Sequence, residues 1–283
     1  MRCDLHTHSI NSDGTSTPAE IIATAKKQGL IVALTDHNTV SGLPAFIEEA
    51  KKQGVIAVGG TELSCAYGDT EFHLLGLFIS PEYYERVEGL VKEFHILKEF
   101  SNIEMIERLN AAGYNITYAD VRRRNANGNA NRAHVAAELL EKGYVSSITE
   151  AFNTLLADDR GFYVQPARLQ LIDAIRFLRQ IEALPIIAHP LQDISAEMLR
   201  SILPELIEAG LVGIETLHSS YSEEQIAVAK EIAHSFSLLE SGGSDYHGTT
   251  KPTIALGSGE GNLNVPEEIY YTLRDYHKNL YKK

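Results

Sequence analysis

Two histidines, His6 and His8, stand two residues apart directly after the short apolar start of the chain. In an extended strand, residues i and i+2 project to the same face, so these two imidazoles are expected to lie side by side. Asp245 and His247 repeat the spacing near the other end of the chain. Imidazole and carboxylate groups together suit zinc, manganese or iron. An isolated pair of this kind is more often a coincidence than a metal site. Whether these histidines are metal ligands therefore depends on the other candidate residues of the chain.

Three more histidines stand at short apolar runs: His37 after 31–35, His73 beside 72–78 and His189 at the end of 184–188. Asp36 and His37 are adjacent and point apart, so we expect His37 to be the ligand and Asp36 to orient it. By contrast, His95, His234 and His277 stand in polar helical surroundings, which favours ordinary surface histidines. Carboxylates in turns and loops are common, so Asp13 and Glu62 are candidate metal ligands only when they are taken together with the histidines.

The elements that must position these side chains alternate along the sequence. Strands are predicted at 31–35, 55–59, 72–78, 184–188, 212–216 and 238–241, and helices at 42–53, 171–181, 195–209 and 222–236. Thr17 followed by Pro18 predicts another helix start, and Pro204 is expected to break its helix. Repeated strand–helix–strand units predict an α/β fold with a parallel sheet closed, or nearly closed, into a barrel. In such a barrel, functional side chains gather where strands end.

The middle of the chain does not continue the strand–helix alternation and is mostly helical in pattern. Residues 81–110 form a long charged stretch of helical character, and 132–142 are helical again before Gly143. We therefore expect a metal-binding barrel made of 1–93 and 163–283, with a mostly helical insertion at 94–162 covering the active site.

Composition restricts the class of protein. The 283 residues suit one large domain, or one domain carrying an insertion, and the hydrophobic fraction of 44% is usual for a globular protein. No apolar run is long enough to span a bilayer, and Asp4, His6 and His8 stand where a signal peptide needs apolar residues. We expect a cytoplasmic protein without a membrane partner, in which Cys3 and Cys65 are reduced.

The net charge of −13 argues against binding of long nucleic acid, which needs a basic footprint. A small phosphorylated ligand is compatible with this charge if bound cations reverse the local field. A serine nucleophile is disfavoured because the sequence has no Gly-x-Ser-x-Gly elbow. Cys65 lies close to Glu62 in sequence, but a small buried thiol explains it better than a nucleophile.

Six motifs in order resemble the PHP domain, the polymerase and histidinol phosphatase superfamily: DLHTHSINSDGTSTP, ALTDHNTVSG, GGTELS, HLLGLF, IIAHP and SGGSDYHG. The resemblance covers the barrel on both sides of the insertion and implies a distorted barrel of seven βα units. Within the superfamily, the insertion and the motif NRAHVA are similar to stand-alone metal-dependent phosphoesterases acting on 3′,5′-nucleotide bisphosphates. Asp13 agrees with that group, whereas some other members carry histidine at this position.

The resemblance implies two or three divalent ions, manganese, zinc or iron. One ion would take His6, His8, Glu62 and Asp245; a second would share Glu62 and take His73 and His189; a third would take Asp13, His37 and His247. Catalytic roles follow for Glu62, Asp245 and His189. Without cations, the carboxylates of Asp13, Glu62 and Asp245 would repel one another, and metal binding would offset that repulsion.

Phosphate contacts follow from the same resemblance. Relatives usually carry Arg-Pro-His where this chain has Arg132, Ala133 and His134, so Arg132 and His134 are expected to contact substrate from an altered loop. The alternative for Arg132 is a surface salt bridge. Arg160 stands where relatives often have a basic residue, and its alternative is an exposed charge at a helix end.

One further substrate contact is expected after strand 212–216. Relatives commonly place a histidine there directly before a serine, but this chain has Tyr221 before its serine. A histidine, His218, lies three residues earlier. We therefore name His218 as a substrate-binding candidate, with Tyr221 as its rival.

The expected function is metal-dependent hydrolysis of a phosphomonoester. The expected substrate is the 3′-phosphate of nucleoside 3′,5′-bisphosphates (pAp to AMP), with 5′-to-3′ trimming of short RNA as an added activity. Enzymatic alternatives are a sugar or cyclic phosphate phosphoesterase and a histidinol-phosphatase-like enzyme; Asp13 and the insertion weaken the latter. A non-catalytic regulatory metal-binding module is the alternative from another class, and the complete ligand set argues against it. Oligomeric state stays open.

Overall fold

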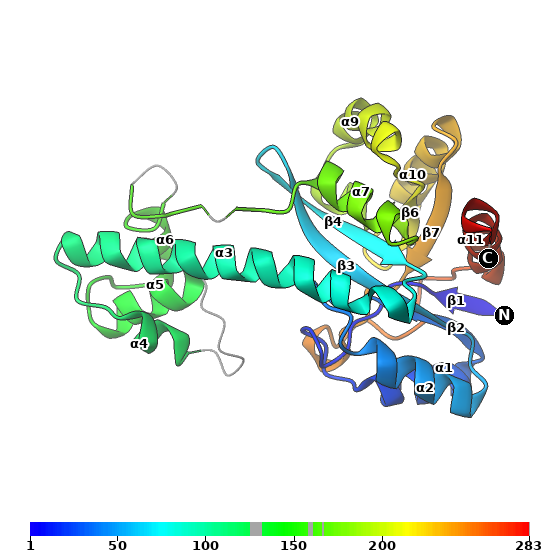
Figure 1. The fold of residues 1–283 in the computed structure, drawn as a ribbon, viewed down its shortest axis with the longest axis horizontal. Coiled ribbons are helices and arrows are strands. Elements are labelled where there is room, and N and C mark those ends of the chain that lie inside the picture. The colour runs from blue at the N-terminus through cyan, green and yellow to red at the C-terminus, as the bar shows by residue number, and fades with distance from the viewer. Residues whose placement is uncertain (125–131, 158–160, 166, 283) are drawn as a thin grey trace. The chain divides into compact units, whose positions relative to one another are not determined.

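The computed structural model describes residues 1–124, 132–157, 161–165 and 167–282. Two compact units divide the chain: Met1–Gly89 together with Leu169–Lys283, and Leu90–Arg168. We call them the barrel unit and the helical unit (Figure 1). The predicted insertion, 94–162, falls within the helical unit, and its covering of the active site stays a prediction.

The barrel unit is built on a seven-stranded sheet in the order β1 to β7. Its strands are β1 (Arg2–Asp4), β2 (Leu30–Leu34), β3 (Ala57–Tyr67), β4 (Thr70–Leu77), β5 (Leu184–Ile187), β6 (Gly213–His218) and β7 (Leu239–Gly243). The first and last strands approach each other, because the Leu5 N–H donates to the Gly242 carbonyl at 3.1 Å. The sheet is thus a nearly closed α/β barrel, as predicted.

The expectation of an all-parallel sheet is wrong for β4, which runs antiparallel to both β3 and β5. The cause is the tight turn after Tyr67, where Gly68 adopts a φ of 60° and returns the chain as a hairpin. Pairing with β4 also extends β3 to Tyr67, well past the predicted end at Gly59. As a result, Glu62 lies inside a strand and His73 pairs opposite Ser64 of that strand.

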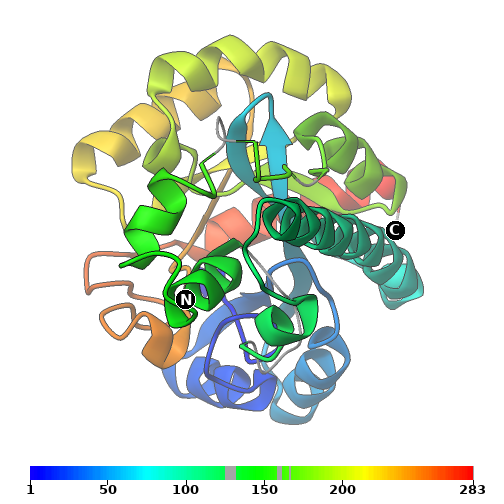
Figure 2. The ribbon, with the colours of Figure 1, turned by 90° about the vertical axis from the view of Figure 1, so that its left-hand side faces the viewer.

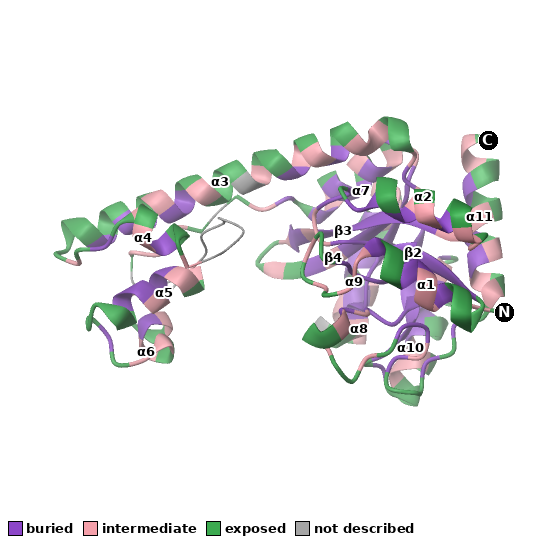
Figure 3. Ribbon diagram, turned by 90° about the horizontal axis from the view of Figure 1, so that it is seen from below, coloured by how far each residue is buried: buried purple, intermediate pink, exposed green. Residues whose placement is uncertain are grey.

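Helices surround this sheet: α1 (Pro18–Gln28), α2 (Leu43–Gln53), α7 (Leu171–Gln180), α8 (Pro190–Asp193), α9 (Ala196–Ala209), α10 (Glu223–Ser235) and α11 (Glu267–Tyr281), with 3-10 turns η1 (Pro81–Tyr83) and η2 (Gly248–Thr250). Figure 2 shows α1 and α2 in blue and α9 and α10 in yellow tones on the outside of the strands. All five residues of β2 are buried, as expected for a parallel strand covered on both faces. Figure 3 shows the strands coloured mainly as buried residues.

Helix α9 does not break at Pro204, contrary to the prediction. It continues without interruption from Ala196 to Ala209 with Pro204 inside it. An internal proline costs a helix about 3 kcal/mol. Burial of a large aliphatic side chain contributes roughly 1.5–3 kcal/mol, so several of them outweigh that cost. The buried face of α9 carries four such residues: Leu199, Ile202, Leu203 and Leu206.

His277 is buried, so the prediction of a surface histidine was wrong at this position. It shares the buried face of α11 with Tyr270 and Leu273, at helical spacing. Its Nε2 lies 2.7 Å from the Glu182 carbonyl oxygen. His234 on α10 is exposed, as predicted.

Thr17 and Glu20 cap the start of α1 reciprocally, as the Thr-Pro motif indicated. The Thr17 hydroxyl accepts the Glu20 N–H at 3.2 Å, and the Glu20 carboxylate accepts the Thr17 N–H at 2.7 Å. We expect Thr17→Ala to lower the free energy of unfolding by about 1 kcal/mol, measured by chemical denaturation. Glu20→Gln is the matched control, because glutamine keeps an acceptor at this position. A Thr17→Ala variant as stable as the parent would contradict the prediction.

The helical unit contains α4 (Tyr118–Arg122), α5 (Arg132–Glu141), α6 (Ile148–Asn153) and most of α3 (Tyr84–Ala111), which begins in the barrel unit. It has its own apolar core: Met105, Ile106, Leu109, Ile116, Val121, Val135, Ala136, Leu139, Val145, Ala151 and Leu156. This separate core makes the helical unit a structural element of its own beside the barrel.

Candidate metal centre

All nine predicted ligands come from the barrel unit, and the structure brings them together. They are His6 and His8 after β1, Asp13 before α1, His37 after β2, Glu62 on β3, His73 on β4, His189 after β5, and Asp245 and His247 after β7. We call these residues the metal centre. The parallel strands end at the same edge of the barrel, and the hairpin after β3 brings the start of the antiparallel β4 to that edge, which is why residues so distant in sequence meet.

Glu62 lies at the middle of the metal centre and is fully buried. Its Oε2 atom is 3.1 Å from each of three ring nitrogens: His6 Nε2, His8 Nε2 and His37 Nδ1. None of these contacts has hydrogen-bond geometry, since Oε2 has no hydrogen-bond partner among the described residues. Three imidazoles therefore lie close to one carboxylate oxygen without forming a hydrogen bond to it.

The second oxygen of Glu62 faces two other histidines. Its Oε1 atom lies 3.0 Å from His73 Nδ1 and 3.2 Å from His189 Nε2. Glu62 is thus positioned to bridge two groups of imidazoles. His37, Glu62 and His73 each have a ligand atom within 4.8 Å of the other two. The predicted second set has His189 in the place of His37.

A third group of side chains forms around Asp13. His247 Nε2 lies 3.1 Å from Asp13 Oδ1, and His37 Nε2 lies 3.8 Å from Asp13 Oδ2. The ring of His8 is between them, with its centroid 4.3 Å from that of His37 and 4.1 Å from that of His247. The structure thus brings together the three residues of the predicted third set, Asp13, His37 and His247, and adds His8 to them.

Asp245 approaches the centre from the end of β7. Its Oδ1 atom lies 3.2 Å from His8 Nε2 and 3.6 Å from His6 Nε2. Asp245 has a φ of 56° and His189 a φ of 27°, in the left-handed region that a side chain rarely adopts. Such backbone strain costs of order 1–3 kcal/mol and persists where surrounding contacts enforce it. Here the Asp245 N–H donates to the His6 carbonyl at 2.9 Å.

The donor atoms fit divalent cations. Two atoms that each bind one ion at about 2.1 Å lie about 3–3.4 Å apart, which is the spacing found around Glu62. Besides Glu62 Oε2, the buried His8 Nδ1 and His73 Nδ1 also have no hydrogen-bond partner among the described residues. Imidazole and carboxylate suit manganese, zinc and iron alike. Shared cations would satisfy buried atoms that the protein alone leaves unsatisfied.

Without a cation, the site keeps its central carboxylate ionised but favours the protonated form of several of its imidazoles. Burial opposes ionisation of Glu62, but the surrounding imidazoles outweigh it and hold the pKa of the carboxyl well below its usual range. Burial likewise opposes protonation of His6, yet Glu62, Glu215 and Asp245 raise its pKa well above normal. Burial lowers the pKa of His37 to about 4, which keeps this imidazole neutral. Because metal binding needs ionised carboxylates and neutral imidazoles, an incoming cation would displace the ring proton of His6.

Glu215 is a functional residue that the sequence reasoning missed. It is fully buried on β6, both of its carboxylate oxygens lie 3.2 Å from His6 Nδ1, and it accepts the His189 N–H at 2.8 Å. It thereby turns His6 Nε2 toward Glu62. Strand β6 carries one extra residue between the pairs Glu215–Ser241 and Leu217–Gly242. This bulge lets Glu215 and His218, three residues apart, face the same side.

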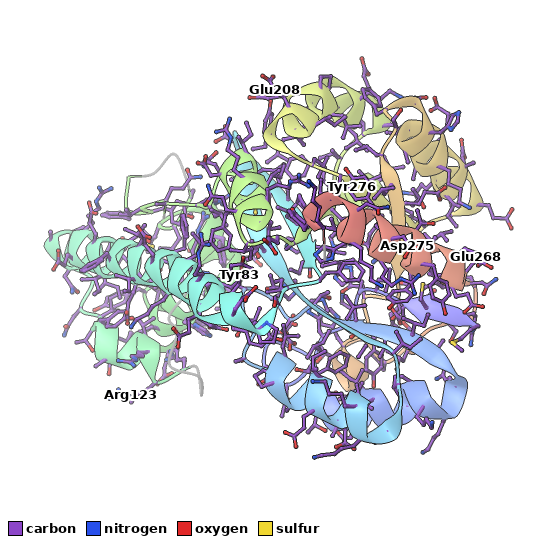
Figure 4. All side chains as sticks on the ribbon, turned by 45° about the vertical axis from the view of Figure 1, so that its right-hand side comes forward. Tyr83, Arg123, Glu208, Glu268, Asp275 and Tyr276 are labelled. Carbon is purple, nitrogen blue, oxygen red and sulfur yellow. The ribbon has the colours of Figure 1, made fainter. Side chains whose placement is uncertain are left out.

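We expect Glu215→Gln to weaken metal affinity about 10–100-fold, because groups that orient metal-binding histidines have effects of this size. Isothermal titration with Mn²⁺ measures it. Glu208→Gln is the matched control, since Glu208 lies exposed on α9, as Figure 4 shows. Equal affinities in the Glu215→Gln variant and the parent would show that Glu215 does not position His6.

Asp36 does not orient His37, contrary to the expectation. Its carboxylate accepts the Ser9 N–H at 2.6 Å, the Ser9 hydroxyl at 2.8 Å and the Ser12 hydroxyl at 2.7 Å. These bonds hold the loop that leads to Asp13. The reason is geometric: adjacent side chains point apart, so Asp36 reaches the neighbouring loop instead of the next imidazole.

The predicted substrate residues fall in different parts of the molecule. Arg132 and His134 lie on α5 of the helical unit, where the Arg132 guanidinium stacks on Tyr163, 3.9 Å from the ring centroid. Their contact with substrate stays a prediction. Arg160 lies outside the described residues. His218 belongs to the barrel unit and is buried beside the metal centre, with its ring centroid 5.1 Å from that of His189.

Neither cysteine has the environment of a nucleophile. Cys3 and Cys65 are both free and buried. Burial is the main reason that the pKa of the Cys3 thiol rises to about 12, and burial also raises the pKa of Cys65. Reactive thiols have lowered pKa values, so thiol chemistry is disfavoured here.

Among the described residues, no helix has the length and apolar character needed to cross a membrane.

A barrel that collects imidazoles and carboxylates around shared positions at its strand ends is the architecture of a metal-dependent hydrolase. The sequence comparison places this chain within that class: residues 4–163 match the PHP domain model, and the chain belongs to the PHP domain family. It is a metal-dependent phosphoesterase with a (β/α)7 barrel of PHP type.

Several curated proteins resemble the chain over most of its length. A 5′-3′ exoribonuclease of Haemophilus influenzae is 29% identical, covering 86% of this chain and 89% of that protein. A phosphoribosyl 1,2-cyclic phosphate 1,2-diphosphodiesterase of Eggerthella lenta is 33% identical, with coverage of 87% and 94%. A 3′,5′-nucleoside bisphosphate phosphatase of Chromobacterium violaceum is 29% identical, with coverage of 94% and 92%.

A solved structure supports the fold at similar coverage. The structure of an amidohydrolase from Chromobacterium violaceum, with bound sulfate and no metal, has a TM-score of 0.71 and 26% sequence identity. It covers 97% of this chain and 96% of that chain. The likeness therefore extends over both the barrel unit and the helical unit.

Proposed function

We propose that this phosphoesterase removes the 3′-phosphate of nucleoside 3′,5′-bisphosphates, converting pAp to AMP. The observation that carries the proposal is the third ligand group, in which the carboxylate of Asp13 lies 3.1 Å from His247. An aspartate at this position is typical of the nucleotide-bisphosphate group within the superfamily. The bisphosphate phosphatase from Chromobacterium violaceum, similar over 94% of this chain, supports the same substrate.

Within this proposal, the nine residues of the metal centre hold two or three divalent ions. Bound ions would supply Lewis acidity for the phosphoryl oxygens and lower the pKa of water toward neutrality. Glu62 faces five imidazoles through its two oxygens. Glu215 fixes the rotation of His6, and Asp245 directs Oδ1 toward His6 and His8. The protein thus contributes a preorganised set of charges at the reacting phosphate.

Exposure indicates the direction from which substrate approaches. The Glu62 and His6 side chains are fully buried and form the floor of the centre. The side chains of Asp13, His37 and His73 are 54%, 23% and 26% exposed and form its rim. A phosphate therefore enters over the rim, with its ester oxygen directed away from the apolar barrel interior.

The test is a phosphate-release assay in Mn²⁺ with pAp, 3′-AMP, 5′-AMP and short 5′-phosphorylated RNA as parallel substrates. We expect pAp to be hydrolysed to AMP with a higher kcat/KM than either monophosphate, and the RNA to be shortened from its 5′ end more slowly. Absence of phosphate release from pAp would reject this substrate, whatever the activity on the others.

A second candidate function is the opening of a cyclic sugar phosphate. The relative of Eggerthella lenta, named as a 1,2-cyclic phosphate diphosphodiesterase, has the higher identity of 33%. Assay of phosphoribosyl 1,2-cyclic phosphate beside pAp separates the two. A higher kcat/KM for the cyclic compound would favour this second function over the first.

A further inference from the structure

One imidazole of the barrel unit has a buried donor without an acceptor. The Nδ1 atom of His218 accepts the Ser220 N–H at 3.3 Å and lies 2.8 Å from the Ser220 hydroxyl oxygen. Because a backbone N–H can only donate, the proton of the neutral ring is on Nε2. His218 is 2% exposed, and Nε2 has no hydrogen-bond partner among the described residues. Buried donors in this situation are rare and call for an explanation.

A lysine meets the same side of Asp245. Lys251, just after η2, places Nζ 2.5 Å from Asp245 Oδ2, and His218 Nε2 lies 3.8 Å from the same oxygen. Among the described residues, Lys251 is the only lysine or arginine within 4 Å of a carboxylate of the metal centre. Its side chain is 42% exposed, so it reaches solvent as well as the centre. The Lys251 ammonium and the neutral His218 N–H therefore both face Oδ2 of Asp245, the oxygen on the other side from Oδ1.

We propose that His218 Nε2–H and Lys251 Nζ form a phosphoryl-binding subsite of the barrel unit. The inference rests on the phosphoester chemistry of the proposed function, not on its nucleotide substrate. An anionic phosphoryl oxygen accepts from both groups at once, which gives the buried N–H the acceptor that the protein does not supply. The ammonium offsets the repulsion between that oxygen and the Asp245 carboxylate.

A cation at this place is disfavoured, although His6, Glu215 and His218 could together hold one. Both Glu215 oxygens already contact His6 Nδ1, and one of them accepts the His189 N–H. The neighbouring Lys251 ammonium would repel a further cation. The Lys251 ammonium is therefore the group at this place that favours an anion.

Tyr221, the rival of His218, has a different role. Its hydroxyl accepts the Leu191 N–H at 2.8 Å, and its ring packs against His218 with centroids 5.5 Å apart. Tyr221 is 3% exposed and supports the His218 ring from one side. His218, and not Tyr221, is the donor of the subsite.

The experiment titrates inorganic phosphate into the metal-loaded protein by isothermal titration calorimetry, with metal content measured by mass spectrometry. We expect Lys251→Met to raise the Kd of phosphate about 10–100-fold at unchanged metal content, since a hydrogen bond to a charged group has this effect. Lys251→Arg should recover part of the affinity. Lys230→Met is the matched control, because Lys230 is exposed on α10.

Variants of His218 provide an independent measurement. Glutamine places an amide N–H near the position of Nε2, so His218→Gln should retain more phosphate affinity than His218→Phe. An unchanged phosphate Kd in Lys251→Met, or a Kd altered only through lost metal, would overturn the proposal. Lys251 would then merely balance the charge of Asp245.

Failure of the substrate proposal gives a different pattern. If the parent protein binds phosphate through Lys251 but releases none from pAp, the subsite stands and the nucleotide substrate is rejected. If pAp is hydrolysed and Lys251→Met binds phosphate as the parent does, the function stands and the subsite is rejected.

Discussion

Replacement of Glu62 by glutamine lowers kcat for phosphoester hydrolysis at least about a thousandfold, equivalent to about 4 kcal/mol of transition-state stabilisation. Glu62 lies 3.1 Å from three ring nitrogens through Oε2 and 3.0–3.2 Å from two through Oε1, so it faces five imidazoles. Glutamine keeps the shape of the side chain but removes the charge and one acceptor oxygen. The expected loss therefore comes from the metal ions that Glu62 joins.

The measurement combines steady-state kinetics with metal content after dialysis. We expect Glu62→Gln to retain fewer ions than the parent, while its circular dichroism spectrum stays that of a folded protein. Glu268→Gln is the control, because it makes the same substitution at an exposed position of α11 (Figure 4). Full metal content together with parental kcat in Glu62→Gln would refute the assignment of Glu62 as the bridging ligand.

Alanine in place of Gly243 is expected to disrupt the centre through sterics alone. A Cβ at this end of β7 would lie 2.4 Å from His6 Cβ and 2.5 Å from His6 N, which is closer than atoms can approach. Because one of these neighbours is backbone, β1 and β7 must separate. We expect a loss of about 1–3 kcal/mol in the free energy of unfolding, together with weakened metal binding.

Chemical denaturation and Mn²⁺ titration test this expectation. Gly89→Ala is the matched control, because Gly89 lies exposed in α3 and a Cβ there meets no atom within 4 Å. Since alanine favours helices over glycine by up to about 1 kcal/mol, this control should be neutral or stabilising. A Gly243→Ala variant with parental stability and metal affinity would show that β1 and β7 are not tightly packed at this point.

The sequence predicted that these side chains would lie together because the periodicity of strands carries most of their geometry, and their binding of metal stays a prediction. His6 with His8, and Asp245 with His247, follow the two-residue repeat, and their side chains meet in the structure. Glu215 escaped prediction because the β-bulge after it shifts the alternation by one residue, so that Glu215 and His218 share a face that a regular strand would not give them.

The errors in the fold have similar causes. The direction of β4 depends on the turn at Gly68, which a strand pattern alone does not reveal. The uninterrupted α9 and the buried His277 show tertiary burial overriding local preference. Such features arise from packing partners distant in sequence, so they lie beyond what local patterns can predict.

The order of the ligands along the chain has a consequence for folding. The first predicted ligand, His6, follows β1 and the last, His247, follows β7, so the centre depends on the closure of the barrel. Asp4 adds to this dependence, since its carboxylate accepts the N–H groups of Ser244 and Gly257. A chain in which β7 has not yet joined the sheet therefore lacks Asp245 and His247 at the centre, so the set of donors is complete only once the barrel has closed.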